Sequence, residues 1–399
     1  MKNRIAGRML SISPSLTLAI SAKAKAMKAA GEPVVSFGVG EPDFNTPEHI
    51  VNAAKSALDN GQTKYTPSSG LLPLRKAICE KFKKDNGLDY EPSQIIVSNG
   101  AKHSIFNACY AVLEEGDEVI IPAPYWLTYP EVVKVCGATP VYIECKKENK
   151  FKFSPADLEA AITPNTKMLI FNSPSNPTGA VYTEEEVRAI AKVCEAHDIF
   201  VLSDEIYEKL CYNGVKPFSI AACSEKMKDL TITVNGVSKT YAMTGWRVGY
   251  LAAPKDVAKA IDSFQSHATS NACSISQYAT IEALASPDEE VEAMRQIFDG
   301  RRAKLLKLIS EIDGVSAVEP DGAFYVMMVV NGLYGKQYNG KTIDGSIAFA
   351  DALLDGAKVA TIPGVSFGAD DCIRLSYALG EADIEEGLKR IKAFVEALQ

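Results

Sequence analysis

The stretch NGVSKTYAMTGWRVGY (residues 235–250) places Lys239 where no other acid or base occurs before Arg247. Its near neighbours include Val237 and Trp246, whereas a solvated lysine usually has charged or polar company. Two interpretations are open at this point. Either Lys239 is a surface lysine in unusual surroundings, or the fold holds one amine in a half-dry pocket.

The composition is that of an ordinary globular protein. The chain has 399 residues, of which 47% are hydrophobic and 23% are charged, and its formal net charge is −8. This length is enough for one large domain and a smaller one. Acidic and basic residues are mixed along the chain without a long basic tract, so we expect a small-molecule substrate and no nucleic-acid partner.

The cysteines and the N-terminal sequence predict a cytoplasmic protein. Nine cysteines are scattered singly, and their odd number argues against a disulfide framework. The four histidines are far apart in sequence, so we expect no metal site. Pro14 and several serines interrupt the N-terminal apolar runs, and no run reaches the ~20 residues of a membrane span. We therefore expect neither a signal peptide nor a membrane segment.

Short apolar runs alternate with helical patterns over much of the chain. Thr183 to Glu186 form a capping box, and the apolar residues that follow it share one helical face. Strands and helices in alternation predict a mostly parallel, buried α/β sheet. The predicted strands are residues 95–98, 118–122, 168–172, 199–203, 230–234 and 248–253.

The pattern changes towards the C-terminus. We predict a large domain over residues 46–290, with helices on both faces of its central sheet. Residues 1–45 and 291–399 are predicted to form a smaller α+β domain, in which 1–45 is the N-terminal segment. The C-terminal elements are predicted helices at 295–312 and 382–398 and predicted strands at 324–330 and 373–378.

Chemically useful side chains follow the predicted strands at their carboxyl ends, where open parallel sheets bind ligands. Asn176 lies in the loop SPSNPTG, Asp204 and Tyr207 follow the next strand, and Lys239 follows the one after that. The glycine-bearing turn NGAKHS (99–104) can open a helix. Each feature alone has an ordinary explanation as a turn, a helix N-cap or a solvated lysine. Together, at one sheet edge, they predict a binding site.

One ligand, pyridoxal 5′-phosphate (PLP), accounts for all of these residues. Its aldehyde forms a Schiff base with a lysine amine, so the pKa of Lys239 has to fall from ~10.4 towards neutrality in a dry site with a cationic neighbour. Asp204 fits the carboxylate that keeps the ring nitrogen protonated. Asn176 and Tyr207 fit the donors to the ring O3′. A phosphate needs N–H groups at a helix start plus a cation, and Gly100, Ala101, Ser238 and Arg247 fit this need.

The sequence resembles fold-type I PLP enzymes, specifically the class I aminotransferases of the bacterial aspartate aminotransferase subgroup. The resemblance covers nearly the whole chain, and SK-x(7)-R combined with NP-x-G and SDE-x-Y is highly specific. It implies ping-pong transamination, in which L-aspartate and 2-oxoglutarate give oxaloacetate and L-glutamate. The matching stretches are FGVGEPDFNTPEHI (37–50), TKYTPSSG (63–70), APYWLTYPE (123–131), NSPSNPTGAVY (172–182), SDEIYE (203–208), VNGVSKTYAMTGWRVGY (234–250), PDGAFYV (320–326) and IRLSYA (373–378).

The resemblance also implies roles around the cofactor. Lys239 would hold PLP and then move the proton between the substrate Cα and the cofactor C4′, with Asp204 and Tyr207 completing the catalytic set. Trp126 would stack on the pyridine ring. Tyr65 would reach the phosphate bound by the neighbouring subunit, which implies a homodimer with shared active sites. The implied cofactor set is Tyr65, Gly100, Ala101, Lys102, Trp126, Asn176, Asp204, Tyr207, Ser238, Lys239 and Arg247.

Substrate recognition is implied for a partly overlapping set. Arg374 would bind the α-carboxylate bidentately, and Gly40 would let the backbone approach the substrate. Lys102 would bind the distal carboxylate of a dicarboxylic substrate; the alternative is a solvated lysine at a helix start. Helix N-termini favour acids, which favours the functional interpretation. The implied substrate set is Gly40, Lys102, Trp126, Asn176 and Arg374.

Other functions are compatible with part of the sequence. A PLP enzyme of this kind could be an aminotransferase for aromatic, alanine-like or prephenate substrates, or a C–S β-lyase. Relatives that also accept prephenate resemble one another in carrying a basic residue at the position of Ser13. This chain has a serine there, which argues against prephenate as a substrate. A PLP-binding regulator would carry a DNA-binding helix-turn-helix, and residues 1–45 contain no such motif. A dinucleotide-binding dehydrogenase is rejected, because no predicted strand is followed by G-x-G-x-x-G.

Overall fold

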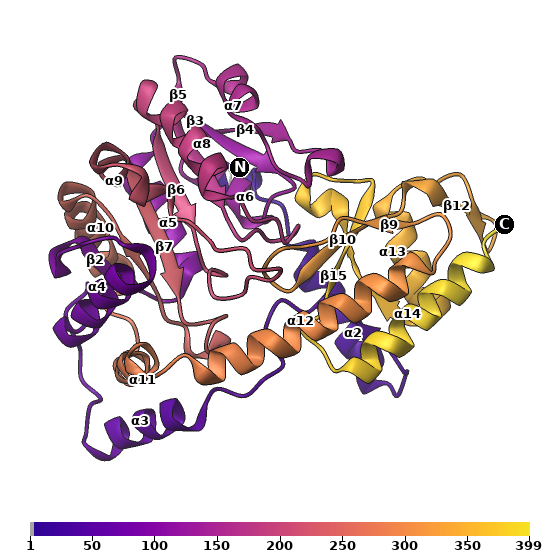
Figure 1. Cartoon of the computed structure of the whole chain (residues 1–399), viewed down its shortest axis with the longest axis horizontal. Coiled ribbons are helices and arrows are strands. Elements are labelled where there is room, and N and C mark those ends of the chain that lie inside the picture. The colour runs from indigo at the N-terminus through magenta and orange to yellow at the C-terminus, as the bar shows by residue number, and fades with distance from the viewer. Residues whose placement is uncertain (1–3) are drawn as a thin grey trace.

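The computed structural model describes residues 4–399, so residues 1–3 of the predicted N-terminal segment lie outside the described residues. A seven-stranded sheet in the order β2-β8-β7-β6-β5-β3-β4 forms its larger part (Figure 1). β8 runs antiparallel to both of its neighbours, and the other pairs are parallel. The predicted mostly parallel sheet is confirmed. Its strands are β2 (Ile95–Ser98), β3 (Glu118–Ala123), β4 (Thr139–Glu144), β5 (Thr166–Asn172), β6 (Phe200–Asp204), β7 (Thr231–Gly236) and β8 (Gly249–Ala252).

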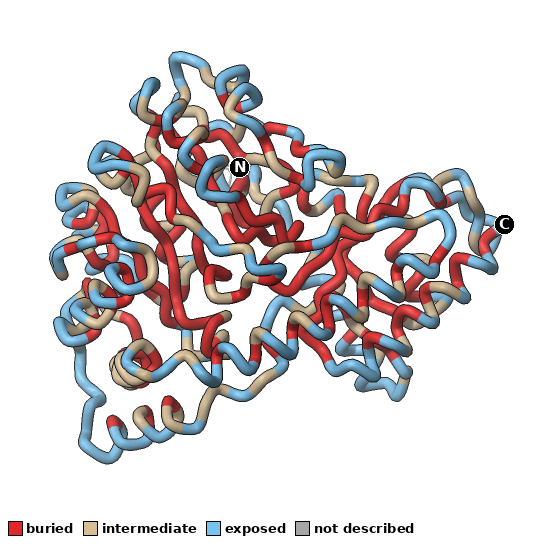
Figure 2. The backbone as a smooth tube through the Cα atoms, in the orientation of Figure 1, coloured by how far each residue is buried: buried red, intermediate tan, exposed pale blue. Residues whose placement is uncertain are grey.

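Helices cover both faces of this sheet, because its strands are apolar on both sides. Ile96 of β2 packs in one cluster with Ile105 and Ile261, while the next residue, Val97, packs in another cluster with Ile78. The strands are buried and the outer helix faces are exposed (Figure 2). The helices are α3 (Glu48–Asp59), α4 (Leu72–Asn86), α5 (Ala101–Val112), α6 (Thr128–Val135), α7 (Pro155–Ala161), α8 (Glu184–Ala196), α9 (Glu225–Leu230), α10 (Lys255–Ala268) and α11 (Ser274–Ala285).

The C-terminal part contains a four-stranded antiparallel sheet in the order β14-β15-β10-β9. The long helix α12 leads to it from the larger part (Figure 1). The strands are β9 (Ser316–Ala317), β10 (Tyr325–Val329), β14 (Ile362–Pro363) and β15 (Cys372–Ser376), with a short pair β11 (Gln337–Tyr338) and β12 (Lys341–Thr342). The helices are α12 (Glu289–Ser310), α13 (Ser346–Ala357) and α14 (Glu381–Glu396).

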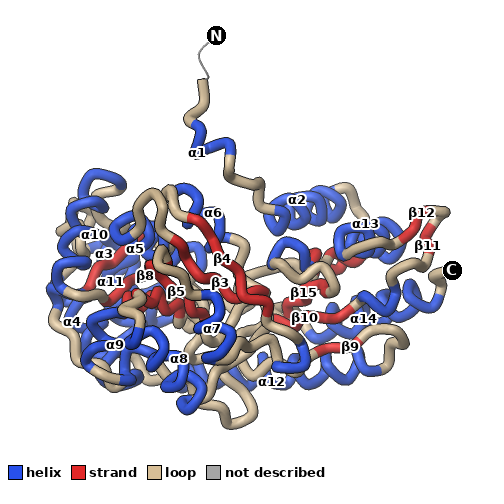
Figure 3. The backbone as a smooth tube through the Cα atoms, turned by 90° about the horizontal axis from the view of Figure 1, so that it is seen from above, coloured by secondary structure: helices blue, strands red, loops and turns tan. Residues whose placement is uncertain are grey.

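Residues 16–36 lie against this C-terminal part, whereas Ser11 and Ser13 are hydrogen-bonded to α6 of the larger part. β1 (Val35–Ser36) pairs in parallel with β13 (Val359–Ala360). α2 (Leu16–Ala29) lies beside α13 (Figure 3), where Ala24 and Leu354 belong to one apolar cluster. α1 (Gly7–Leu10) precedes it. The domain boundaries at 45/46 and 290/291 stay a prediction, and α12 crosses the second of them.

Local sequence signals explain most of these elements. The capping box at the start of α8 is confirmed, with Thr183 accepting from the Glu186 N–H at 3.3 Å and Glu186 accepting from the Thr183 N–H at 2.8 Å. β4 was not predicted. It is an edge strand that contains Pro140 and is only partly buried, so it lacks a strong apolar run. No helix within residues 4–399 is long and apolar enough to cross a membrane.

Candidate active site

A cavity of about 430 Å³ lies at the carboxyl ends of β5, β6 and β7. This volume falls within the range of small-molecule sites. It is lined by every predicted site residue except Gly100 and Tyr65, so the fold brings together side chains that are far apart in sequence. The predicted residues that line it are Gly40, Ala101, Lys102, Trp126, Asn176, Asp204, Tyr207, Ser238, Lys239, Arg247 and Arg374.

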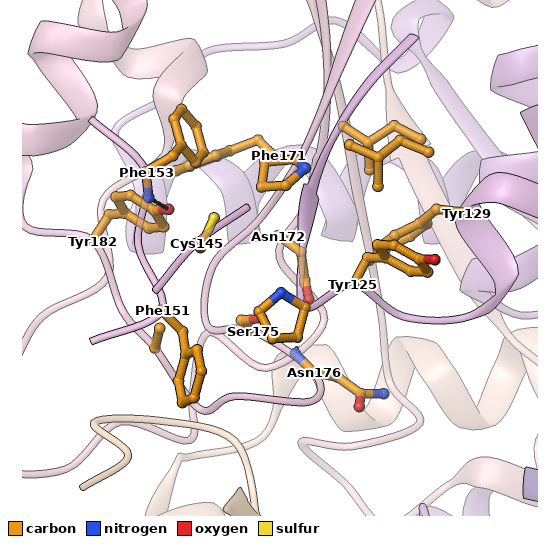
Figure 4. A pocket seen from close by; sticks show the side chains of 15 residues that line it. Tyr125, Tyr129, Cys145, Phe151, Phe153, Phe171, Asn172, Ser175, Asn176 and Tyr182 are labelled. Carbon is orange, nitrogen blue, oxygen red and sulfur yellow. Dashed lines mark hydrogen bonds between the residues drawn. The ribbon is translucent and has the colours of Figure 1, made fainter. Parts of the chain in front are cut away.

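A second cavity, of about 30 Å³, lies behind the loop that follows β5 (Figure 4). Aromatic side chains such as Phe151, Phe153 and Tyr182 form much of its lining, and Asn176 contributes to both cavities. It is too small for a cofactor. A third hollow, at Thr46 and Trp246, has a similar volume but is lined by none of the predicted site residues. The cavity of about 430 Å³ is therefore the candidate active site.

Lys239 lies in the turn after β7, and its amine is held by backbone. The Nζ donates to the carbonyl oxygen of Gly40 at 2.5 Å. Burial lowers the pKa of Lys239 to about 8, and the guanidinium groups of Arg374 and Arg247 add to this effect against the opposing charge of Glu41. A useful fraction of the amine is therefore the free base near neutral pH, as a nucleophile or base requires. Lys239 is not an ordinary solvated lysine.

Asp204 ends β6 and is buried. Its Oδ2 accepts a hydrogen bond from the Tyr129 hydroxyl at 2.7 Å, and its Oδ1 accepts from the Ile206 N–H at 3.2 Å. Burial raises the pKa of Asp204 to about 6, although the Tyr129 and Ile206 bonds and the charge of Lys239 oppose this rise. It is a carboxylate at neutral pH. No α-helix begins at Asp204, so the alternative of a helix N-cap is wrong.

The start of α5 forms an anion-binding turn beside Arg247. Gly100 is the N-cap with φ +88°, and a Cβ there would overlap the Arg247 guanidinium. A Cβ on Gly249 of β8 would likewise overlap the Ala101 nitrogen. The Arg247 side chain donates only to neutral acceptors among residues 4–399, the carbonyls of Thr244 and Asn99 at 2.9 and 3.4 Å. Helix N–H groups, a guanidinium and the nearby Ser238 hydroxyl suit a phosphate.

Arg374 is a buried cation in the middle of β15. Its Nη1 donates to the Asn176 Oδ1 at 3.0 Å and its Nη2 to the Gly38 carbonyl at 3.3 Å, both neutral oxygens. Its Nε has no partner among the described residues, and the guanidinium lies 4.4 Å from the Tyr325 ring centre. A buried charge without a counter-ion is costly. This arrangement therefore fits an incoming carboxylate.

Lys102 and Trp126 meet at the cavity wall. The Lys102 Nζ lies 4.8 Å from the centre of the Trp126 ring, while the lysine side chain remains exposed. Partial burial and the charge of Arg247 lower the pKa of Lys102. Tyr207 is buried, and its hydroxyl is 3.0 Å from that of Tyr325. Lys102 and Tyr207 both line the cavity, so each can contact a bound ligand.

Tyr65 does not reach the cavity of its own chain. It is 91% exposed and lies in the loop between α3 and α4. The predicted role of Tyr65 concerns a second copy of the chain, so it stays a prediction.

Sequence reasoning missed several residues of the cavity. Tyr129 and Tyr325 both lie in stretches quoted for the family resemblance. Tyr129 is three residues after Trp126, and Tyr325 lies within PDGAFYV, so the sequence did carry a signal for both residues. Thr17, Leu18 and Ser21 of α2 carried no signal, because they reach the cavity only through tertiary packing. The missed lining residues are Thr17, Leu18, Ser21, Gly38, Tyr129, Asn172, Ile206, Thr244 and Tyr325.

The balance of charge in the cavity favours anions. Lys102, Lys239, Arg247 and Arg374 line it, against the single carboxylate of Asp204. Walls of one sign concentrate ligands of the opposite sign. Within residues 4–399, no group of three or more His, Cys, Asp and Glu side chains could hold a metal ion.

A mostly parallel α/β fold with a half-buried amine, a buried carboxylate and an anion-binding turn at the strand ends has the groups that a PLP-dependent enzyme requires. Residues 32–391 match the family model for aminotransferase class I and II, and the chain belongs to this family. PLP is therefore its cofactor, and the residues present fit its phosphate through the Gly100 turn and the Arg247 guanidinium beside it.

Similar proteins agree with this assignment over the full chain. The chain is 51% identical to the aspartate aminotransferase of Geobacillus stearothermophilus, with 99% of both chains covered. It is 50% identical to that of Bacillus subtilis, covering 98% of this chain and 99% of the relative. The crystal structure of the Rhizobium meliloti aspartate aminotransferase matches with a TM-score of 0.96 at 44% identity, with 100% of both chains covered.

Proposed function

We propose that the enzyme transfers the amino group of L-aspartate to 2-oxoglutarate, giving oxaloacetate and L-glutamate by ping-pong transamination. The observation that carries this proposal is Arg374, a buried guanidinium without a counter-ion in the same cavity as Lys239. An α-carboxylate would pair with it bidentately. The names of the relatives, which are aspartate aminotransferases at about half identity, support the choice of substrate.

Asp204, Asn176 and Tyr207 are proposed to hold the cofactor ring. Bound PLP supplies an electron-withdrawing ring that stabilises the charge left when the substrate Cα loses its proton. Asp204, a carboxylate at neutral pH, keeps a proton on the ring nitrogen. The Oδ1 of Asn176 already accepts from Arg374, so its Nδ2 is the donor left for a ring oxygen. The buried Tyr207 hydroxyl can donate to the same oxygen.

Lys239 is proposed to bind the cofactor covalently and to carry the proton. With a pKa of about 8, its amine can take a proton from the substrate Cα and deliver it to the C4′ position of the cofactor. Gly40 accepts a hydrogen bond from the same amine, which orients it between these tasks. Both half-reactions need this reversible step.

Lys102 is proposed to select dicarboxylic substrates. It is a cation at the cavity wall and pairs with no carboxylate among the described residues; its contact there is the Trp126 ring. A second carboxylate on the substrate would supply the missing counter-charge. An aromatic or alanine-like substrate would leave this charge unused.

The phosphate site and Tyr65 lead us to propose a homodimer with shared active sites. Gly100, Ala101, Ser238 and Arg247 would hold the phosphate within one chain. Tyr65 is exposed on a loop, where it can reach a second copy. All nine cysteines are free, which supports our further proposal of a reducing cytoplasmic location.

Complementation tests the shared site. A dimer of one Lys239→Ala chain and one Tyr65→Phe chain keeps one site with both residues intact if Tyr65 acts across the interface. A dimer of a doubly substituted chain and a wild-type chain keeps none. Tagged, purified heterodimers should therefore be active in the first arrangement and impaired in the second. The reverse order would place Tyr65 in its own chain's site.

A spectroscopic experiment tests the substrate. L-Aspartate alone is added to the holoenzyme, and the visible band of the bound cofactor is followed before 2-oxoglutarate is added. The band should disappear with L-aspartate and return with 2-oxoglutarate. A band that responds to an aromatic amino acid or to alanine, but not to L-aspartate, would refute the proposed substrate and retain the cofactor.

A further inference from the structure

A largely buried polar cluster lies beside the active-site strand ends, outside the cavity. We call it the Glu208 cluster; it consists of Lys81, Asn86, Glu205, Glu208 and Asn235. Asp204 and Tyr207 line the cavity, whereas the alternating Glu205 and Glu208 do not. One short segment thus carries ligand-binding side chains on one side and this cluster on the other.

Glu208 is the centre of the cluster and is fully paired. It accepts from the Lys81 ammonium, from the Asn86 Nδ2 at 2.9 Å and from the Asn235 Nδ2 at 2.8 Å. Burial acts to raise the pKa of Glu208, but Lys81 and the amide donors hold it below its ordinary value. A buried carboxylate with this many donors has a fixed orientation.

Glu205 anchors the same segment from its other side. Its carboxylate accepts from the hydroxyls of Ser203 and Ser219 at 2.9 and 2.6 Å, and its N–H donates to the Val234 carbonyl at 2.9 Å. The segment from Asp204 to Glu208 is therefore held against β7 by backbone as well as side chains.

Asn235 links this anchored segment to the turn that carries Lys239. It lies in β7, four residues before Lys239, and its Oδ1 accepts from the Gly236 N–H at 2.8 Å. Gly236 is packed without free space, since a Cβ there would lie 3.1 Å from Gly249 Cα and 3.2 Å from Ile206 Cδ1. A shift of Asn235 therefore moves the following turn.

The turn itself is stiff enough to transmit such a shift. The Tyr241 N–H donates to the Val237 carbonyl at 3.2 Å, and the Met243 N–H donates to the Ser238 carbonyl at 3.1 Å. Lys239 lies between the two residues that each bond joins. The position of its Cα is therefore set by the backbone on both sides.

We propose that Asn235 is a positioning residue, which uses its bond to Glu208 to hold Ser238 and Lys239 in place against Asp204 and Tyr207. The inference rests on the proposed function, because it concerns the geometry of the same reaction. Asn235 touches neither cavity. It acts through the turn, and misplacement of a reacting group by about 1 Å can cost roughly 10²-fold in rate.

The test compares Asn235→Ala with a matched control, Asn86→Ala. Each variant removes one amide donor from Glu208. Asn86, which also accepts from the Lys81 ammonium at 2.8 Å, ends α4 and is far along the chain from the turn that carries Lys239. Purified holoenzymes are compared by melting temperature, kcat, KM and the pH titration of the visible cofactor band. We expect both variants to have a lower melting temperature than the wild-type enzyme. Asn235→Ala alone should shift the band titration and lower kcat roughly 10- to 100-fold, with a smaller change in KM.

Equal band titrations and equal kcat values in the two variants would overturn the inference. If Asn235→Ala does not fold, Asn235→Ser is compared with Asn86→Ser under the same criteria. A wild-type band that fails to respond to L-aspartate is a separate result: it refutes the proposed function and not the positioning role, which the band titration still tests.

Discussion

The Tyr129→Phe substitution tests how the protein keeps Asp204 ionised. The Tyr129 hydroxyl donates to Asp204 at 2.7 Å in a buried setting, where the pKa of Asp204 is already raised to about 6. A hydrogen bond to a charged group contributes about 1.5–3 kcal/mol. At 1.36 kcal/mol per pKa unit, its loss raises the pKa of Asp204 by roughly one to two units. The pKa of Asp204 would then lie at roughly 7 to 8, so that about half or more of the group would be protonated at pH 7.

The direction of the effect on cofactor binding follows from this shift. A protonated Asp204 cannot pair with a protonated ring nitrogen, so the apo-variant should bind PLP weakly at pH 6–7 and recover at higher pH. Fluorescence titration of apoenzyme with PLP across pH measures this. Tyr182→Phe is a matched control, because Tyr182 is also buried but accepts from the Phe153 N–H at 3.0 Å instead of contacting Asp204. A Tyr129→Phe profile that coincides with wild type would refute the reasoning.

Three further substitutions test other parts of the cavity. Arg374→Lys keeps the charge but loses bidentate pairing, so kcat/KM should fall at least roughly tenfold for every amino acid in steady-state assays, and an unchanged value would remove Arg374 from carboxylate binding. Lys102→Met should lower kcat/KM for L-aspartate but not for L-alanine, whereas an equal loss for both would indicate a general role such as support of Trp126. Gly249→Ala should weaken PLP binding measured by equilibrium dialysis, because its Cβ would displace the Ala101 nitrogen, and unchanged affinity would show that the turn adapts.

The sequence predicted the residues that follow buried strands better than those placed by packing. Asp204 and Lys239 follow apolar runs that favour buried strands, so the strand ends locate them. The hydrogen bond between Tyr129 and Asp204 depends on how α6 packs over the sheet, which no local pattern encodes. The same holds for Thr17 of α2, because its place at the cavity depends on contacts made elsewhere in the chain.

The predicted roles of Tyr65 and Lys102 are tested by experiments on the dimer and on the substrates. Tyr65 has to be tested with a second copy, since its side chain points to solvent in one chain. Lys102 lines the cavity and is exposed, and its role in substrate binding stays a prediction that the substrate assay tests.

Two buried charged side chains of this protein differ in whether the chain itself supplies a partner of opposite charge. Glu208 and Arg374 are both buried, yet Glu208 has an ammonium and two amides, while Arg374 has only neutral acceptors and an unpartnered Nε. An unpaired buried charge destabilises the folded chain unless something binds to it. We therefore propose that the fold tolerates Arg374 because a substrate carboxylate pairs with it, whereas the Glu208 cluster is complete without a ligand. That difference distinguishes Glu208, which follows β6, from Arg374 in the middle of β15, although both side chains are buried.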